Sequence, residues 1–327
     1  MAVAHGIRMM QTGGPEVLTW GELPEPEAGP DDLVVRLHAA GLNFIDTYHR
    51  SGLYPVPLPY VPGVEGAGEV VAVGPGAAAA GFAPGHRVAW TSVPGSYAEL
   101  VRVPARNAVT VPAAVSSETA AAVMLQGMTA HFLVTDTFPL GPGHRCLIHA
   151  AAGGVGRLLV QLAKQRGAEV FATVGSPAKA EMVRALGADH VIDYRTRDFA
   201  ADVEAVAGPR SLDVVYDGVG KAVFEASLGL LRRRGLMATF GNASGPVDPV
   251  APLRLMQLGS LFLTRPTLAD HLVERSDLLR RSGELFEAIG AGRLDVEIGL
   301  RLPLAEAAEA HRRLESRTTT GKVLLVP

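Results

Sequence analysis

The stretch Arg145-Cys-Leu-Ile-His149-Ala-Ala-Ala-Gly153-Gly-Val-Gly156 decides the fold, because it joins an apolar run to a helical pattern through a glycine-rich turn. The apolar run predicts a buried strand, and the helical pattern covers Arg157–Arg166 and stops at Gly167, a residue typical of helix ends. A glycine-rich turn in this context leaves backbone N–H groups and the positive end of a helix dipole open to a pyrophosphate. The stretch therefore predicts a dinucleotide-binding turn, although Ala151 stands where the first glycine is usual.

Each position of this turn has an expected task. Gly153 lets the backbone approach the phosphates, and Gly156 lets the helix pack closely on the strand. Gly154 and Val155 lie between them, in the first turn of the helix. We therefore expect the phosphates of a cofactor to lie at the N-terminus of this helix, next to Gly153.

Strand and helix patterns alternate after this turn. A helix is expected to begin at Ser176-Pro177, where a capping residue precedes proline, and to end at Gly187. Further strands are expected at Glu169–Val174, His190–Asp193, Asp213–Asp217, Leu236–Phe240 and Ser260–Thr264. Alternation of this kind predicts an α/β domain, a doubly wound parallel sheet with helices on both faces.

The first ~120 residues have a different texture, rich in glycine, proline and valine. Short strands with Gly/Pro turns between them predict a β-barrel or rolled sheet. The expected strands are Leu33–Leu37, Glu69–Val73, Arg87–Trp90 and Tyr97–Val103. Two stretches stand out there: Asn43–Pro55 alone predicts a polar, aromatic loop, and Pro62–Gly68 a glycine-rich strand pair.

The tail after about residue 266 contains no second dinucleotide motif. Its pattern predicts helices at Asp270–Ile289 and Pro303–Arg313 and a strand at Val323–Val326. From the residues alone, this tail either extends the sheet domain or returns to the N-terminal one.

Composition excludes several classes of protein. The chain has 327 residues, 19% of them charged, and a formal net charge of −3, which argues against a basic nucleic-acid binder and against a charge-rich disordered chain. The single cysteine, Cys146, rules out an internal disulfide and a cysteine-rich zinc site. The apolar stretch 120–134 is too short and polar to span a membrane, and the N-terminus lacks the apolar core of a signal peptide. We therefore expect a cytoplasmic protein that binds neither membrane nor nucleic acid.

The end of the second strand indicates which dinucleotide is bound. Enzymes that use NAD place a carboxylate there for the ribose 2′-hydroxyl, but this chain has Gly175-Ser176 and, a helical turn later, Lys179. Tyr194, with Arg195 beside it, closes the third strand. A missing carboxylate with a nearby cation and hydroxyls favours a 2′-phosphate, so the expected cofactor is NADP(H).

Hydrolytic and metal chemistry fit the sequence poorly. Ser244 is one position away from a nucleophile elbow, and there is no HExxH motif. The ten histidines are scattered, and only His49 lies near the candidate substrate segment. We expect most of them to be surface or core residues.

The motifs taken together resemble the zinc-free quinone oxidoreductases of the medium-chain dehydrogenase/reductase superfamily, the group that includes zeta-crystallin. The resemblance covers nearly the whole chain and is carried by NFIDTYHRSGLYP, PGVEGAGEVVAVG, LQGMTA, HAAAGGVG, YDGVG, RRGLMATFGNASG, GSLFLTRP and ESRTTTGKVLLVP. It implies a GroES-like β-rich catalytic domain at 1–122, a Rossmann NADP(H)-binding domain at 123–265, and a return to the catalytic domain at 266–327.

The resemblance also implies that both zinc sites of the superfamily are absent. Asn43 stands where zinc members have a cysteine ligand, and Val64 where they have histidine. One cysteine cannot supply the four-cysteine lobe. Without a Lewis acid, alcohol dehydrogenation is not expected, whereas a quinone accepts hydride with little polarisation.

Site residues follow from the same resemblance. It places Tyr48, Tyr54 and Gln126 beside the quinone, with Asn43 shared between catalysis and cofactor. Close relatives often have lysine in place of Gln126, and Gly218 replaces a serine that can contact the cofactor. The implied cofactor contacts are Asn43, Thr129, Gly153, Gly154, Val155, Gly175, Ser176, Lys179, Tyr194, Phe240, Asn242, Leu263, Arg265 and Arg317.

The expected reaction is direct hydride transfer from the nicotinamide to a bound quinone, with the proton coming from water or from Tyr48. Whether one or two electrons reach the product is left open. Two alternatives remain, a zinc-free enoyl or 2-alkenal reductase with the same fold and a non-catalytic NADPH-binding protein. The resemblance also suggests a homodimer joined through the strand Ser260–Thr264, since an apolar edge strand needs cover.

Overall fold

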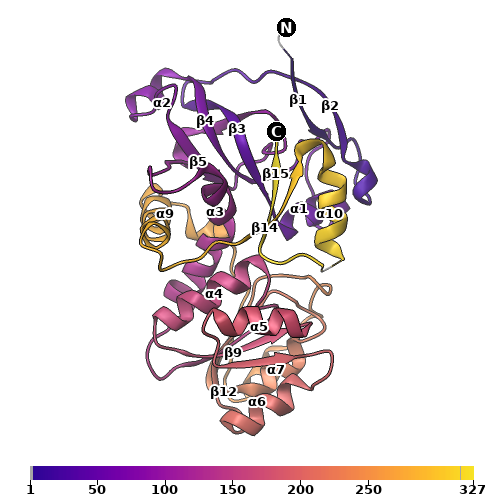
Figure 1. The fold of residues 1–327 in the computed structure, drawn as a ribbon. Coiled ribbons are helices and arrows are strands. Elements are labelled where there is room, and N and C mark those ends of the chain that lie inside the picture. The colour runs from indigo at the N-terminus through magenta and orange to yellow at the C-terminus, as the bar shows by residue number, and fades with distance from the viewer. Residues whose placement is uncertain (1–2, 317) are drawn as a thin grey trace. The chain divides into compact units, whose positions relative to one another are not determined.

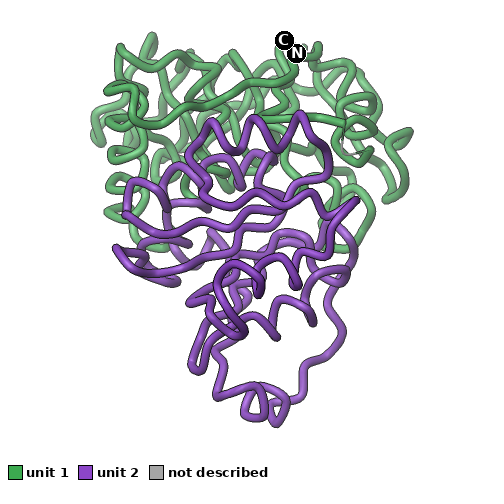
Figure 2. Tube along the Cα trace, turned by 60° about the horizontal axis from the view of Figure 1, so that its bottom comes forward, with its two compact units in different colours: residues 1–128, 272–327 green, residues 129–271 purple. Residues whose placement is uncertain are grey.

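A computed structural model describes residues 3–316 and 318–327 (Figure 1). The chain divides into two compact units, coloured separately in Figure 2. Unit 1 comprises residues 1–128 and 272–327, and unit 2 comprises residues 129–271. Both boundaries lie a few residues after the expected ones. Arg317, an expected cofactor contact, lies outside the described residues.

Unit 1 is built on a seven-stranded sheet that is antiparallel except for one parallel pair, β14 with β15. The tail thus returns to the N-terminal part of the chain, because β15 pairs with β3 through Val323 and Leu42. In spatial order the strands are β14 (Ile298–Pro303), β15 (Lys322–Val326), β3 (Asp32–Leu42), β4 (Glu65–Val73), β5 (Arg87–Thr91) and β7 (Ala108–Thr110), with β6 (Leu100–Pro104) also on β3.

Smaller elements complete unit 1. A separate two-stranded sheet pairs β1 (Val3–Arg8) with β2 (Thr19–Pro24), and the core between these elements and the main sheet contains the fully buried Trp90 and Tyr97. The helices are η1 (Pro15–Val17), α1 (Phe44–Ser51), α2 (Pro75–Ala79), η2 (Ala105–Asn107), α9 (Arg275–Gly290), η5 (Leu304–Glu306) and α10 (Ala307–Glu315). α10 lies beside β14 and β15 (Figure 1).

The prediction of a loop over Asn43–Pro55 is wrong for its first half, which forms α1. The Asp46 carboxylate accepts a hydrogen bond from the Asn43 backbone N–H over 2.8 Å and so satisfies one of the N–H groups of the first turn. Gly52 ends the helix with a left-handed φ of 83°. Both signals are local, so this helix was within reach of sequence reasoning.

Unit 2 is a six-stranded, fully parallel sheet in the order β10-β9-β8-β11-β12-β13. Numbered along the unit, this is the 3-2-1-4-5-6 order of a Rossmann fold. The strands are β8 (Arg145–Ile148), β9 (Glu169–Val174), β10 (His190–Asp193), β11 (Leu212–Asp217), β12 (Leu231–Thr239) and β13 (Phe262–Thr264). The expected α/β sheet is therefore confirmed.

Helices connect these strands. α3 (Ser117–Phe132), inside which the unit boundary falls, continues into a π-helical turn, η3 (Leu133–Thr137). The others are α4 (Gly154–Gln165), α5 (Pro177–Ala185), α6 (Phe199–Ala207), α7 (Phe224–Leu230), α8 (Pro252–Gln257) and η4 (Leu268–His271). Among the described residues, no helix is long and apolar enough to cross a membrane.

Some expected boundaries are corrected. β13 starts at Phe262, because Ser260 has a left-handed φ of 56° that a strand cannot accommodate. β6 starts at Leu100, because the Tyr97 N–H bonds to Pro62 instead of a neighbouring strand of the sheet. The expected strand at Tyr97–Val103 is therefore shorter at its start.

The two tail helices are also corrected. The expected helix Asp270–Ile289 is broken between η4 and α9, where Val273 is 74% exposed and has no core to pack against. The expected helix at Pro303–Arg313 begins one residue later, at η5, because Pro303 still pairs with Val326 in the sheet.

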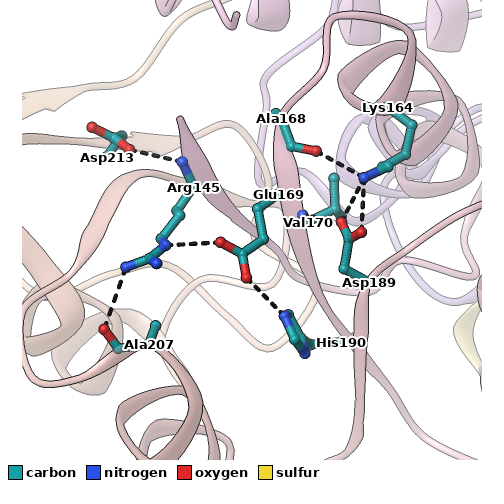
Figure 3. Close-up of polar contacts among 9 residues, drawn as sticks. All are labelled: Arg145, Lys164, Ala168, Glu169, Val170, Asp189, His190, Ala207 and Asp213. Atoms are coloured by element: carbon teal, nitrogen blue, oxygen red, sulfur yellow. Dashed lines mark hydrogen bonds and ion pairs between the residues drawn. The ribbon is translucent and has the colours of Figure 1, made fainter. Parts of the chain in front are cut away.

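The starts of the parallel strands in unit 2 are joined by ion pairs (Figure 3). Glu169 accepts hydrogen bonds from Arg145 Nε over 2.8 Å and from His190 Nε2 over 2.9 Å. Asp189 binds Lys164 Nζ at 2.7 Å and the Val170 N–H at 2.7 Å. This cluster lies at the edge opposite the glycine-rich turn, so it secures the sheet away from the candidate cofactor residues.

Candidate active site

The glycine-rich turn of unit 2 has the geometry that a phosphate cradle requires. Gly153 is the N-cap of α4 with extended backbone angles, and a Cβ on it would meet only the Ala150 carbonyl oxygen, at 3.2 Å. A Cβ on Gly156 would collide with that carbonyl and lie 2.7 Å from Ala151 Cα. The helix therefore packs on the turn as closely as glycine allows, while Gly154 and Val155 begin its first turn.

A second group of expected residues meets at the end of β9. Ser176 caps α5 through its side chain, which accepts from the Lys179 N–H over 3.3 Å. The Tyr194 hydroxyl lies over Gly175, since a Cβ there would be 2.6 Å from the Tyr194 oxygen. The Tyr194 N–H binds the Val174 carbonyl over 3.1 Å, which holds the tyrosine at this position.

Two cationic residues, Lys179 and Arg195, also belong to this group of expected residues and their neighbours. The pKa of Lys179 is lowered, first by partial burial and then by the positive charge of Arg195. The two positive charges are therefore near enough to influence each other. Sequence reasoning noted Arg195 without assigning it a role. Two adjacent cations beside Ser176, at a strand end without a carboxylate, form a favourable position for a 2′-phosphate.

The ends of β11 and β12 supply the next expected contacts. The Phe240 N–H binds the Asp217 carbonyl over 2.8 Å, and a Cβ on Gly218 would lie 3.1 Å from the Phe240 ring. The glycine that replaces the serine of relatives thus leaves room for this ring. Asn242 follows in the same loop, where its carbonyl accepts from the Gly245 N–H over 2.9 Å.

Three further expected residues also lie in unit 2. Thr129 is buried in α3, and Leu263 pairs with Met237 in β13. Arg265 Nη1 donates to the Thr239 carbonyl over 3.1 Å at the same strand ends. The Rossmann strand order, the glycine turn and the paired cations together fit a dinucleotide phosphate.

The aromatic residues expected beside the substrate gather in unit 1. The rings of Tyr48, in α1, and Tyr54, in the loop after it, pack edge to face with centroids 5.2 Å apart. His49 packs near Tyr54 and Tyr60, at 6.3 and 5.9 Å. Burial lowers the pKa of His49, which favours the neutral form of this ring.

Asn43 and Gln126 meet directly. Gln126 Nε2 donates to Asn43 Oδ1 over 3.1 Å, and Lys322 Nζ donates to the same oxygen over 2.9 Å. Lys322 also pairs with Glu65, and both side chains are completely buried. Burial lowers the pKa of Lys322, and the Glu65 carboxylate counteracts this effect. Sequence reasoning missed this ion pair, whose partners lie 257 residues apart.

The buried polar network continues from Asn43 through α1. Asp46 Oδ2 accepts from the Tyr97 hydroxyl over 3.1 Å, and that hydroxyl lies 3.4 Å from His311 Nε2. His311 Nδ1 contacts Arg50, which forms a two-pronged ion pair with Glu315. Burial raises the pKa of Asp46 to about 7 and lowers that of His311 to about 3.

Comparisons with known proteins agree with this geometry. The family model of the alcohol dehydrogenase GroES-like domain matches residues 29–113, and that of the zinc-binding dehydrogenase matches residues 154–286. These matches place a GroES-like domain and a Rossmann-like dinucleotide domain in one chain.

Three full-length relatives are informative. Quinone oxidoreductase of Pseudomonas aeruginosa is 45% identical over 99% of this chain and 100% of its own. The structure of Escherichia coli quinone oxidoreductase complexed with NADPH has a TM-score of 0.96 at 42% identity, covering 99% of this chain and 100% of that one. The 2-haloacrylate reductase of a Burkholderia species is 41% identical over 96% of each chain.

A GroES-like domain joined to a Rossmann-like domain is the architecture of a dinucleotide-dependent oxidoreductase. The chain belongs to the quinone oxidoreductase family of the medium-chain dehydrogenase/reductase superfamily. The resemblance stated from the sequence is confirmed.

Proposed function

We propose that this protein is an NADPH-dependent quinone reductase. The observation that carries the proposal is the pair Lys179 and Arg195 beside the Ser176 cap, at a strand end without a carboxylate. The Escherichia coli relative that was solved with NADPH supports it. The overall change is NADPH + H⁺ + quinone → NADP⁺ + hydroquinone, in which the two electrons travel with the hydride.

The chain's contribution to cofactor binding is positioning. The N–H groups at the start of α4 hold the pyrophosphate, and Lys179, Arg195 and Ser176 hold the 2′-phosphate. Tyr194 covers Gly175 beside the adenosine end. When bound, NADPH supplies the hydride from C4 of its nicotinamide.

On the substrate side, Tyr48 and Tyr54 offer an aromatic wall to a planar quinone, and Gln126 offers a polar contact. The proton comes from water or from the Tyr48 hydroxyl, so no residue need be an essential acid. We expect Tyr48→Phe to lose less than tenfold in kcat. A loss of about 10²–10⁴-fold, the range typical of general acid catalysis, would contradict this expectation.

Turnover without a metal is part of the proposal. At the positions of the zinc ligands stand the Asn43 amide, which hydrogen-bonds to Lys322, and the apolar Val64. Neither is a zinc ligand of the usual kind. Dialysis against EDTA is expected to leave quinone turnover unchanged, and a loss that zinc restores would contradict this part.

The proposal is tested by an acceptor screen. Initial rates are measured with naphthoquinone, phenanthrenequinone, 2-alkenals and enoyl thioesters, each with NADPH and with NADH. The expected result is that quinones with NADPH react fastest. Faster turnover of alkenals, or equal rates with NADH, would contradict the substrate or the cofactor assignment.

A matched pair of variants tests the cofactor contact. We expect Lys179→Ala to raise the Kd of NADPH roughly ten- to a hundredfold, as loss of a charged hydrogen bond implies, and to leave the Kd of NADH unchanged. Lys221→Ala, in an exposed pair with Asp248 of the same unit, is the control and should change neither. Equal effects of Lys179→Ala on both cofactors would show that Lys179 does not recognise the 2′-phosphate.

A second candidate function is reduction of an activated C=C bond. The 41% identity with 2-haloacrylate reductase favours it, because that relative matches almost as well as the quinone oxidoreductases. The acceptor screen separates the two activities. Tight NADPH binding without turnover of any acceptor would favour a non-catalytic NADPH-binding protein.

A homodimer through β13 is also part of the proposal. β13 is the edge of its sheet and pairs only with β12, and its Phe262 is 56% exposed. A second copy of the same strand would cover this edge. We expect a dimer mass by sizing with light scattering, and a monomer for Phe262→Asp but not for Val206→Asp, an equally exposed position on α6. A monomeric wild type would contradict it.

We place this activity in the cytoplasm, where NADPH is regenerated. The only cysteine of the protein, Cys146, is buried and cannot form an internal disulfide, so the fold needs no oxidising compartment. Immunoblots of fractionated cells test this assignment, and recovery outside the cytoplasmic fraction would contradict it.

A further inference from the structure

Asn43 has no hydrogen-bonding capacity left for a ligand. The residue is 3% exposed. Nδ2 donates to the Gly41 carbonyl over 3.2 Å and to Glu65 Oε2 over 2.8 Å, while Oδ1 accepts from Lys322 and Gln126. An amide has two N–H donors and an oxygen that accepts two bonds, so all four positions are used within the protein.

The charges around Asn43 fix which way its amide points. The Lys322 ammonium can only donate, so the atom 2.9 Å from it must be the carbonyl oxygen. The Glu65 carboxylate accepts, so Nδ2 must face it. The buried ion pair thus allows one orientation of the Asn43 amide.

This orientation is passed on to Gln126. Because Asn43 Oδ1 is an acceptor, Gln126 must present its Nε2 to it. The second N–H of Nε2 and the Oε1 atom of Gln126 then remain for other partners, since the described residues offer them no further hydrogen bond. Gln126 is only half-buried, so its side chain is not sealed inside the protein.

We propose that Gln126 is the catalytic polar contact, donating this second N–H to the quinone carbonyl, and that Lys322, Glu65 and Asn43 are positioning residues that hold the amide of Gln126 in the donating orientation. This inference rests on the proposed function. A donor aimed at the carbonyl gains strength as negative charge develops on that oxygen during hydride arrival. Asn43 then acts through Gln126 and contacts neither quinone nor cofactor.

A double-mutant cycle tests the chain of contacts. The variants Gln126→Leu, Asn43→Leu and their combination are assayed for quinone turnover, with the exposed Gln11→Leu as the substitution control. We expect each single variant to lose about tenfold or more in kcat, as loss of a transition-state donor implies. The combination should lose no more than Gln126→Leu alone, because Asn43 acts only through it.

The Kd of NADPH, from fluorescence titration, separates this role from direct cofactor binding. We expect it to stay within about twofold of wild type in all these variants. Additive losses in kcat, or a large rise in the Kd of NADPH for Asn43→Leu alone, would overturn the inference, because Asn43 would then contact the cofactor itself.

An NMR measurement tests the orientation of the Gln126 amide without relying on enzyme activity. The chain has only five glutamines, so ¹⁵N-glutamine labelling gives five side-chain amide pairs, and Gln126→Leu assigns one. In Glu65→Gln/Lys322→Met, which removes the charges together, the substitution at position 65 adds a sixth amide pair. Among the five pairs of the wild type, the Gln126 pair should shift while the other four stay. Lys322→Arg keeps a cationic donor. In this variant the Gln126 pair should stay close to its wild-type chemical shift, and most of the quinone turnover should remain.

An unshifted Gln126 pair in the double variant would overturn the positioning role. A wild-type enzyme that reduces no quinone would instead contradict the proposed function, whereas the NMR result would still decide how Gln126 is held. The two failures are therefore distinguishable.

Discussion

Two ion pairs, one in each unit, lie in opposite surroundings. In unit 2, Arg145 and Glu169 pair over 2.8 Å at the start of the sheet, with 39% and 36% of their side chains exposed. In unit 1, Lys322 and Glu65 pair with 1% and 0% exposed. Water screens the exposed pair Arg145–Glu169. It does not reach Lys322 and Glu65, whose charges are compensated only by each other and by their hydrogen bonds within the protein.

This difference separates two uses of charge. An exposed pair gains little free energy, because each partner is almost as well solvated alone. A buried pair has lost its hydration, so it adds little net stability, but removing one partner leaves an uncompensated charge. What the buried pair does provide is orientation, because every polar group that contacts it must match its charge.

The largest expected effect comes from breaking the buried pair. Lys322→Met should reduce the free energy of unfolding by about 3–5 kcal/mol, because Glu65 is left buried without a cation. Glu65→Gln/Lys322→Met should recover much of that loss, since no charge remains. Thermal and urea unfolding of both variants measure this. A double variant as unstable as the single one would mean that packing, and not charge, dominates here.

A smaller effect is expected from Asp46, whose titration should make the free energy of unfolding depend on pH. Burial raises its pKa to about 7 in the folded protein from 3.8, so the folded state binds a proton that the unfolded state has released. Stability should therefore fall as pH rises from about 4 to 7, by at most about 1.4 kcal/mol per pH unit from this group.

Asp46→Asn should remove that part of the slope. Its amide oxygen can still accept from the Tyr97 hydroxyl and the Asn43 N–H, as Asp46 Oδ2 does. Unfolding midpoints between pH 4 and 8 are compared with wild type. An unchanged slope would show that Asp46 does not titrate in this range.

The smallest effect is expected in the exposed cluster of unit 2. Glu169→Gln should change the free energy of unfolding by less than about 1 kcal/mol, and the difference should shrink further in high salt. Denaturant unfolding at two salt concentrations tests this. A larger loss that salt does not reduce would contradict the assignment of this cluster as a solvated surface network.

The same cluster should respond to acid with the opposite sign from Asp46. Partial burial raises the pKa of Glu169, but the hydrogen bonds to His190 and Arg145 together outweigh it, so the pKa is lowered from 4.5. Its contribution is present above the unfolded pKa and is lost as pH falls through the folded one. Glu169→Gln should therefore weaken the acid dependence below about pH 4.5, which unfolding curves from pH 3 to 6 can show.

Local signals made much of this fold predictable. The strand, glycine turn and helix of residues 145–166 are set by neighbours in the sequence, and so are the Ser176 cap and Lys179 beside it. The helix α1 was predicted as a loop from its polar and aromatic residues, although Asp46 accepts from the Asn43 N–H at its start. The break before α9 depends on Val273 having no core to face, which no local pattern reveals.

The polar centre of unit 1 could not be predicted in the same way. Lys322 stands in an apolar strand, KVLLV, and nothing nearby indicates that its partners are Glu65 and Asn43. These contacts exist only because β15 pairs with β3. The family resemblance therefore suggested Asn43 and Gln126 as site residues, while only the fold shows which side chains hold them.

The return of β15 to β3 also sets an order of assembly. Asn43 leaves the ribosome 279 residues before Lys322, whereas unit 2 is one continuous segment that can fold as soon as it has been made. Until β15 arrives, Glu65 has no cation and β3 has an open edge. Nascent chains halted before residue 322 should therefore bind NADPH through unit 2 while Gln126 is not yet held, so cofactor binding would precede turnover during synthesis.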